Sequence, residues 1–370
     1  MKKLIAVLLC VSMLALAAAC QTAAPAPAAT DAPMATEAPM ATEAPMEEPM
    51  EAPMEEPETA TEMAAEKTGL YVSTSVADSK SVGDENGTAK ADSLVVAVTV
   101  DASGVITNCY IDSVQSSIGF DKEGKLTTDM ATTFETKNEL GTNYGMAQYS
   151  PIGKEWNEQA AAFAAYCVGK TADEVGGIAM AEGVASDADL ASSVTIHIGG
   201  FINAVTTAVK NATESGAHAG DKLGLAMVTN MSKSADASAD AEGVAQAYST
   251  YAVVTTDASG VITSCIIDAS QANVKFDAAG QITTDLTAPV MTKNEIGAGY
   301  GMAKASSIGK EWNEQAAAFA AYCVGKTADE VKGIAMDGQG LAADADLLSS
   351  VTIHIGDFMN VVSKAVGNAK

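Results

Sequence analysis

The stretch LVVAVTVDASGVITNCYID, residues 94–112, decides the fold of this chain. Its two halves, Leu94–Val100 and Val105–Ile111, are rich in β-branched and other apolar residues, which favour strands. Between them, Asp101–Gly104 is a turn sequence that ends in glycine. The stretch therefore predicts a β-hairpin. A second turn sequence, Asp121–Gly124, predicts another hairpin just beyond it.

Helical patterns follow the hairpins. Lys154–Val168 has apolar residues at helical spacing and predicts a helix that Gly169 stops. Thr171–Glu174 has the spacing of a capping box and predicts the start of a short helix. The apolar residues of Val194–Val209 share one face and predict a final helix. Strands first and helices later indicate the α+β class, with an antiparallel sheet packed by helices.

This pattern occurs twice. The block Ile152–Val175 recurs without change at Ile308–Val331, and the segments around it recur in the same order. Each copy is long enough to enclose a core of its own. We predict two tandem homologous domains at residues 67–214 and 215–370, and we expect each to fold independently.

The first 66 residues have a different composition. Lys2 and Lys3 precede a short apolar run and then small residues, which is typical of a signal peptide over residues 1–19. The apolar run is too short for a transmembrane helix. Residues 20–66 begin with Cys20 and are otherwise almost all Ala, Pro, Thr, Glu and Met. Such a segment has no aromatic residue to bury, so we predict a disordered linker.

The small residues directly before Cys20 resemble a bacterial lipobox. The resemblance implies that Cys20 is diacylated and becomes the first residue of the mature protein. We therefore expect the protein at the extracellular face of the cell membrane, held there by the lipid anchor alone. An ordinary secretory signal with an incidental Cys is the alternative.

The charge is strongly one-sided. The formal net charge is −26, and every basic residue apart from three His is Lys, because the chain has no Arg. Nucleic-acid binding needs clustered basic residues, so we expect no nucleic-acid partner. A bound phosphate must be held by backbone N–H groups, Lys, hydroxyls or a covalent bond, because the guanidinium clamp is missing.

Four Cys remain after the N-terminal segment, in two equivalent pairs. They are Cys109 with Cys265 and Cys167 with Cys323. No CxxC spacing occurs, which argues against a redox dithiol or a zinc site. We expect buried free thiols rather than a disulfide within each copy.

Other common sites are excluded by their spacing. Gly169–Thr171 resembles the end of a P-loop, but the first Gly of that motif is absent and the tripeptide follows a helix. His197 and His354 occur one per copy, so we expect no metal site.

One segment remains as a candidate site. Asp-x-x-Ser-Ser-Val-Thr occurs at Asp189–Thr195 and again at Asp346–Thr352, each ahead of a predicted helix. It resembles the flavinylation motif of FMN-binding domains, Asp-x-x-Ser/Thr-Gly-Ala-Thr, with Ser-Val in place of Gly-Ala. A Ser/Thr-rich helix start without a ligand is the alternative.

In that family the last Thr of the motif carries FMN through a phosphoester bond, which a flavin transferase installs from FAD with magnesium. The resemblance implies two covalent FMN groups, with the aspartates orienting the segment or helping to bind the transferase's magnesium. We expect Ser192 or Ser193 to cap the following helix, so that Thr195 lies in its first turn near the positive end of the helix dipole. The implied cofactor-binding residues are Asp189, Ser192 and Thr195 in the first copy and Asp346, Ser349 and Thr352 in the second.

The repeat together with the lipid anchor is similar to the two-domain flavin lipoproteins of Gram-positive bacteria that act in extracellular electron transfer. The resemblance implies an electron carrier rather than an enzyme. It implies transfer of electrons from a membrane quinol pathway to external acceptors such as free flavins or iron. A surface interaction lipoprotein that keeps the fold without flavin is the alternative, and a solute-binding lipoprotein is a weaker one. Aromatic residues at matched positions are either core residues or stack on the flavin ring: Tyr144, Trp156, Tyr300 and Trp312.

Overall fold

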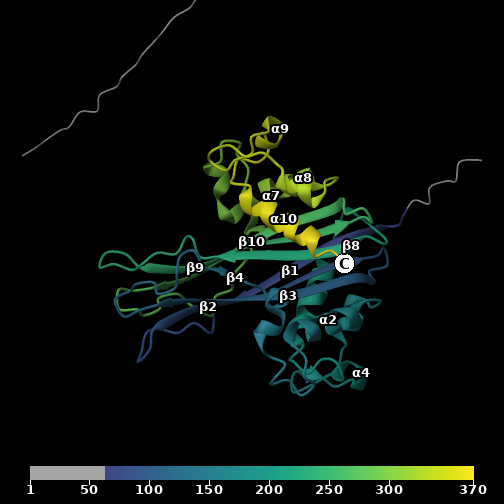
Figure 1. Cartoon of the computed structure of the whole chain (residues 1–370), viewed down its shortest axis with the longest axis horizontal. Helices are drawn as coiled ribbons and strands as arrows, with labels where there is room; N and C mark the ends of the chain where they lie inside the picture. Colours follow the sequence, from purple (N-terminus) through teal and green to yellow (C-terminus); the bar gives the residue numbers. More distant parts are fainter. Residues whose placement is uncertain (1–62) are drawn as a thin grey trace, which may run out of the picture. The chain divides into compact units, whose positions relative to one another are not determined.

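The computed structural model describes residues 63–370, and Figure 1 shows the arrangement of their strands and helices. The elements of the first copy are β1 (Ala65–Ser75), β2 (Gly87–Val100), β3 (Ile106–Phe120), β4 (Thr133–Phe134), α1 (Lys137–Leu140), η1 (Gly141–Tyr144), α2 (Trp156–Cys167), α3 (Ala172–Gly176), β5 (Met180–Ala181), β6 (Val184–Ala185), α4 (Ala188–Ala191), α5 (Gly199–Lys210) and β7 (Thr213–His218). Those of the second copy are β8 (Lys222–Asn230), β9 (Gly243–Thr256), β10 (Ile262–Phe276), α6 (Lys293–Ile296), η2 (Gly297–Tyr300), η3 (Met302–Lys304), α7 (Trp312–Cys323), α8 (Ala328–Lys332), α9 (Ala345–Leu348) and α10 (Gly356–Gly367).

Each copy contributes one antiparallel sheet built from long hairpins. The first sheet has the strand order β3-β2-β1-β7, and the second has the order β10-β9-β8-β4. The hairpin predicted around Asp101–Gly104 is confirmed, with Val98 opposite Cys109, although both strands run further than predicted. The turn at Asp121–Gly124 is also present, and Phe120 forms a single bridge to Leu126 beyond it.

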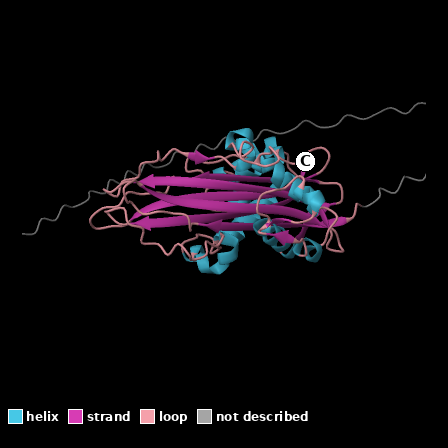
Figure 2. Cartoon of the chain, turned by 90° about the horizontal axis from the view of Figure 1, so that it is seen from below, coloured by secondary structure: helices cyan, strands magenta, loops and turns pink. Residues whose placement is uncertain are grey.

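The sheets and helices form four layers. Figure 1 shows α7, α8, α9 and α10 on one side of the strands and α2 and α4 on the other, and Figure 2 shows the long strands lying between the helices. In each copy the helices bury an apolar core against the outer face of their own sheet, centred on Phe163 and Phe201 in the first and on Phe319 and Phe358 in the second. The α+β prediction is confirmed.

The inner faces of the two sheets pack on each other and form a core that both copies share. One cluster joins Val95, Ala97 and Leu70 of the first sheet with Leu225 and Val253 of the second. A second cluster is centred on Phe120 and Phe276, whose rings stack with centroids 4.2 Å apart. Both rings are fully buried.

The two copies also exchange short segments. β4 leaves the first copy and pairs with β8 of the second sheet, and Val290 of the second copy makes the reciprocal bridge to Thr74. At the far turns, the Val82 amide donates to the Gly280 carbonyl at 2.9 Å and the Ala237 amide donates to the Gly124 carbonyl at 2.7 Å. The copies are therefore interlocked, which argues against the expectation that each folds alone.

The predicted boundaries differ from the observed strands. The boundary between residues 214 and 215 falls inside β7, which pairs with β1 and so extends the first sheet. The first strand starts at Ala65, two residues before the predicted start of the domain. The predicted signal peptide and Cys20 lie outside the described residues, as does the predicted linker up to residue 62.

The helix predictions hold for two of the three helices. The helix predicted over residues 154–168 is observed as α2, and Gly169 after it has a φ of +81°. Thr171 caps α3 with the predicted box to Glu174. The final helix was predicted too long, because α5 begins only at Gly199. The preceding apolar residues Val194 and Ile198 are buried, but they belong to a loop.

Candidate functional site

The last threonine of each motif lies in a loop, not in a helix. Thr195 follows α4 and precedes α5, whose N-cap is Ile198, and Thr352 has the same position before α10. The prediction that Thr195 lies in the first turn of the helix is therefore wrong. The run of helical spacing was misleading because the loop also buries an apolar residue every few positions. A phosphate on Thr195 would therefore lie outside the first turn of α5, which begins at Gly199.

A buried glutamine holds each threonine. Gln159 is fully buried in α2, and its Oε1 accepts hydrogen bonds from the Thr195 amide at 2.8 Å and from the Thr195 hydroxyl at 3.2 Å. Gln315 makes the same two bonds to Thr352, at 2.8 and 3.2 Å. The glutamine Nε2 donates to the backbone carbonyl of Lys154 or Lys310, which fixes the orientation of the amide. The half-buried hydroxyl therefore has one defined direction.

The serines do not cap the following helix. The Ser192 hydroxyl donates to the Asp189 carbonyl at 2.7 Å, and the Ser193 hydroxyl donates to the Leu190 carbonyl at 3.4 Å. Ser192 is instead the C-cap residue of the short helix α4, and α5 has no side-chain cap. Ser349 repeats the contact of Ser192 by donating to the Asp346 carbonyl at 2.6 Å. The capping prediction is wrong, because these hydroxyls satisfy carbonyls at the end of the preceding helix.

The aspartates of the motif are exposed. Asp189 lies in the first turn of α4, whose cap is its neighbour Asp187, and Asp346 has the same place in α9. The first serine of each motif therefore contacts the backbone of the motif aspartate, while the threonine contacts the buried glutamine. The exposed carboxylates are accessible to another protein, and neither of them forms a hydrogen bond with the threonine of its motif.

A pocket lies directly beside Thr352. The two residues that follow it, Ile353 and His354, line a cavity of about 350 Å³. Trp312 forms part of the wall and packs edge-on against Phe358 with ring centroids 5.5 Å apart. The remaining lining residues come from β8, β9, β10, α6, η3 and α10 and the loop after β8: Asn230, Ser232, Lys233, Tyr248, Gln271, Lys293, Met302 and Asp357.

The pocket contains a buried lysine that forms no ion pair within residues 63–370, although Asp357 lines the same pocket. Lys293 is 4 % exposed, and its Nζ donates to the Tyr248 hydroxyl at 3.1 Å. The Nζ also lies over three aromatic rings, 4.8 Å from the centroid of Tyr248, 4.7 Å from that of Tyr300 and 4.6 Å from that of Trp312. Burial lowers the pKa of Lys293 to about 8, although the charge of Asp268 opposes the shift. The aromatic faces stabilise the cation only in part, so an anion in the pocket would be favoured.

The first copy differs from the second at several positions of this environment, including Gly200 in place of Asp357 and a change at the position of Tyr248. The hydroxyl pair Thr74–Ser93 of the first copy matches Thr229–Ser249 of the second, so Asp92 stands where Tyr248 stands. Asp92 forms an ion pair with Lys90 at 3.2 Å. The lysine equivalent to Lys293 is Lys137, which lies over Tyr144 and Trp156, 4.8 Å from each centroid.

The thiols and histidines show no sign of a metal site. Cys109, Cys167, Cys265 and Cys323 are free thiols, as expected, and burial raises the pKa of Cys167 and of Cys323 to about 12. Such thiols are poor nucleophiles and poor ligands at neutral pH. Over residues 63–370, no three His, Cys, Asp or Glu side chains are arranged to hold a metal ion.

Sequence reasoning missed the residues that orient the threonines and charge the pocket. Gln159 and Gln315 lie in the identical block Trp-Asn-Glu-Gln of each copy, three residues after the tryptophan. The sequence shows that both copies have this glutamine. It does not show that the loop after α4 brings Thr195 into contact with Gln159. Trp312 and Tyr300 were predicted to be either core residues or residues that stack on the flavin ring. Trp312 is buried, Tyr300 is partly buried, and both rings contact the Nζ of Lys293.

Comparison with known proteins identifies no relative. No family model, no curated protein and no solved structure matches the chain. In the part of the chain that the structure describes, none of the helices has the length and apolar character needed to cross a membrane.

Proposed function

We propose that this protein is an electron carrier anchored at the extracellular face of the cell membrane through a lipid on Cys20, with FMN attached to Thr195 and to Thr352. The observation that carries the proposal is the pocket beside Thr352. There a duplicated flavinylation-like motif adjoins an aromatic wall and a buried ammonium. A flavin ring is planar and aromatic and gains negative charge when reduced, so it suits such surroundings.

The chemistry of attachment follows from the threonine hydroxyl. Thr352 Oγ1 would attack the phosphorus of the FMN half of FAD, and the bond from that phosphorus to the oxygen of the AMP half would break. A phosphoester would form, AMP would leave, and the hydroxyl proton would pass to a base of the flavin transferase. Gln315 orients the hydroxyl but is not a base, and the exposed Asp346 is available to the transferase and its magnesium. The covalent bond would keep the cofactor on a protein outside the cell.

The residues of the pocket would then position the flavin. The bound flavin supplies reversible electron transfer, which the side chains themselves cannot perform. Trp312 and Tyr248 line the pocket with aromatic rings, and Lys293 holds a positive charge near them. We propose a membrane quinol-linked donor and external acceptors such as free flavins or iron as the partners.

The alternative is a surface interaction lipoprotein that keeps this fold without flavin. A chain produced with a flavin transferase should, under our proposal, be yellow and keep its flavin absorption after denaturation and filtration. Flavin that passes the filter would indicate non-covalent binding. A colourless protein from a host whose transferase modifies a control substrate would favour the interaction protein.

A further inference from the structure

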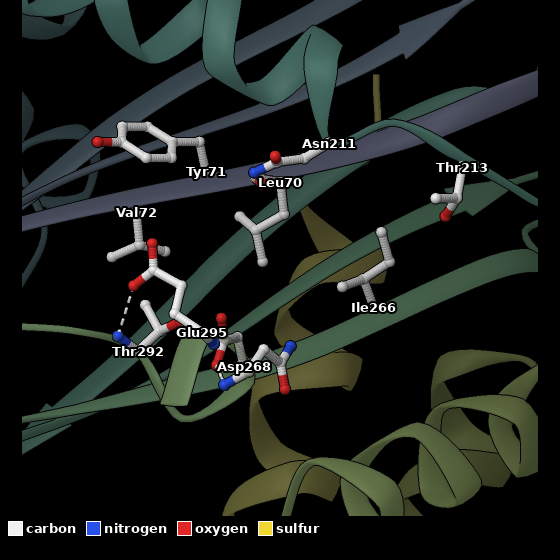
Figure 3. A pocket seen from close by; sticks show the side chains of 10 residues that line it. Leu70, Tyr71, Val72, Asn211, Thr213, Ile266, Asp268, Thr292 and Glu295 are labelled. Atoms are coloured by element: carbon white, nitrogen blue, oxygen red, sulfur yellow. Dashed lines mark hydrogen bonds between the residues drawn. The ribbon is translucent and has the colours of Figure 1, made fainter. Parts of the chain in front are cut away.

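A second cavity, of about 360 Å³, lies between β1 of the first sheet and β10 of the second. Figure 3 shows the apolar side chains of Leu70, Val72 and Ile266 directed into it from the two strands, while Glu295 and Asp268 lie at one end. The cavity therefore has aliphatic walls and an acidic end. It shares no lining residue with the pocket beside Thr352.

The internal repeat provides a comparison within the same molecule. At the equivalent place between β8 and β3, a lysine of the chain fills the space. Lys364 of α10 forms an ion pair with Glu139 Oε1 at 2.5 Å and donates to the Met227 carbonyl at 2.8 Å. Lys370 covers the ring of Tyr110, with the Nζ 4.4 Å from the centroid. This half of the molecule therefore binds a primary ammonium group.

The cavity keeps the acceptors of that site. Glu295 corresponds to Glu139, and each uses Oε2 to accept from the amide of its capping threonine, at 2.7 and 2.8 Å. Their Oε1 atoms differ: that of Glu139 binds Lys364, whereas that of Glu295 has no hydrogen bond or ion pair within residues 63–370. Asn211 donates to the Leu70 carbonyl as Asn368 donates to that of Leu225. Carbonyls of alternate residues in a strand point to the same side. The Val72 carbonyl therefore points to the same edge of β1 as the Leu70 carbonyl, just as the Met227 carbonyl points to the same edge of β8 as that of Leu225.

The cavity lacks the lysines that fill its counterpart. Thr207 of α5 has the place of Lys364, and its hydroxyl donates to the Asn203 carbonyl in its own helix. Thr213 has the place of Lys370, and Ile266 has that of Tyr110. Three shorter side chains thus leave open the space that Lys364, Lys370 and Tyr110 occupy in the other half.

From this asymmetry we infer that the cavity is a binding site for a small aliphatic primary amine. The ammonium group binds Glu295 Oε1 and the Val72 carbonyl, as Lys364 binds Glu139 and Met227, and the alkyl chain lies against Leu70, Val72 and Ile266. A charge-assisted pair supported by a carbonyl orients the ammonium, and the aliphatic walls favour an amine over an inorganic cation. The net charge of −26 raises the local concentration of such cations. This site is independent of the flavin proposal.

The test uses the flavin-free full chain and titrates it with butylammonium at constant ionic strength. We expect saturable binding of one equivalent, and Glu295→Gln should weaken it by roughly threefold to fivefold, because an ion pair to an exposed carboxylate is lost. Thr207→Lys should abolish the binding by supplying an internal ammonium. The matched variant Glu139→Gln should leave it unchanged, because Lys364 occupies that site.

Tetramethylammonium controls for general attraction of cations to an acidic surface, since it has no N–H donor, and it should not bind with saturation. The inference would be overturned if the wild type showed no saturable binding of butylammonium. It would also be overturned if tetramethylammonium bound equally well, or if binding persisted in both Glu295→Gln and Thr207→Lys. A variant that combines Lys364→Thr, Lys370→Thr and Tyr110→Ile provides an independent test, because it should open the counterpart and raise the stoichiometry to two, and a stoichiometry of one would count against the inference.

Discussion

The shared core between the sheets leads to a prediction that separates one folding unit from two. Replacing Phe276 with Ala removes a fully buried ring that belongs to the second copy and stacks on Phe120 of the first at 4.2 Å. Removing a buried Phe typically costs about 3–5 kcal/mol. About 0.5–1.5 kcal/mol of this would come from the aromatic pair itself. A loss of ~4 kcal/mol is a large part of the ~5–15 kcal/mol that stabilises a typical domain.

The chain carries its own reporters for this measurement. The only tryptophans are Trp156 in the first copy and Trp312 in the second, and both are buried. In single-tryptophan variants, made with Phe at the other position, urea unfolding followed by fluorescence reports on one copy at a time. We expect Phe276→Ala to lower the unfolding midpoint equally for both reporters. Val331→Ala, which lies in the helix-facing core of the second copy, is a control for general loss of packing.

A shared core would be contradicted by a shift of the Trp312 signal alone, or by a wild type that unfolds in two separate transitions. Either result would restore the expectation of two independently folding domains. A double-mutant cycle with Phe120→Ala should give a coupling energy of about 0.5–1.5 kcal/mol.

Three further predictions concern the anchor, the buried acids and the buried lysine. Cys20→Ala should release the protein into the culture medium, as measured by fractionation, and tight retention on the membrane would count against lipid anchoring. Burial raises the pKa of Asp268 from 3.8 to about 6, so its contribution to stability is full below pH 3.8 and is lost as the pH rises through about 6. Asp268→Asn keeps the acceptor for the Asn294 amide and cannot ionise. Between those pH values the free energy of unfolding of the wild type should therefore fall by ~3 kcal/mol more than that of this variant. Parallel curves of unfolding free energy against pH would contradict the raised pKa. In the flavin-loaded protein, Lys293→Gln should lower the midpoint potential of the second flavin by tens of millivolts, since ~30 mV corresponds to about 1.4 kcal/mol for two electrons. Lys137→Gln should leave that potential unchanged.

Local signals in the sequence predicted the local parts of this fold well. The alternation and turn residues of the hairpin, the capping box at Thr171 and the buried face of α2 are each decided by neighbours within a few positions. These local signals do not predict that the two sheets pack on each other. The inner face of a sheet is apolar both when it packs on the other copy and when it packs on an element of its own copy. The duplicated sequence favoured two cores, whereas the exchange of β4 and the Phe120–Phe276 stack join the copies.

The sequence indicated only the local part of the candidate site, because its patterns report on residues a few positions apart. The motif identified Thr195 and Thr352 by residue type and order, and periodicity then placed them wrongly in a helix. The contacts that define the site join residues far apart in the chain, such as Gln315 with Thr352 and Lys293 with Tyr248. No spacing rule in a single sequence indicates such pairs. The difference between Asp92 and Tyr248 became meaningful only when the strand registers aligned the two copies.

Covalent attachment of FMN to Thr195 and Thr352 can be measured by intact-mass spectrometry of the chain produced with a flavin transferase. The account predicts two covalent FMN groups on the wild type, one on each of Thr195→Val and Thr352→Val, and none on the double variant. Valine keeps nearly the volume of threonine while removing the hydroxyl, and Thr352→Ser is the control that keeps a nucleophile. A flavin adduct that survives in the double variant, or an unmodified wild type beside a modified control substrate, would contradict the account.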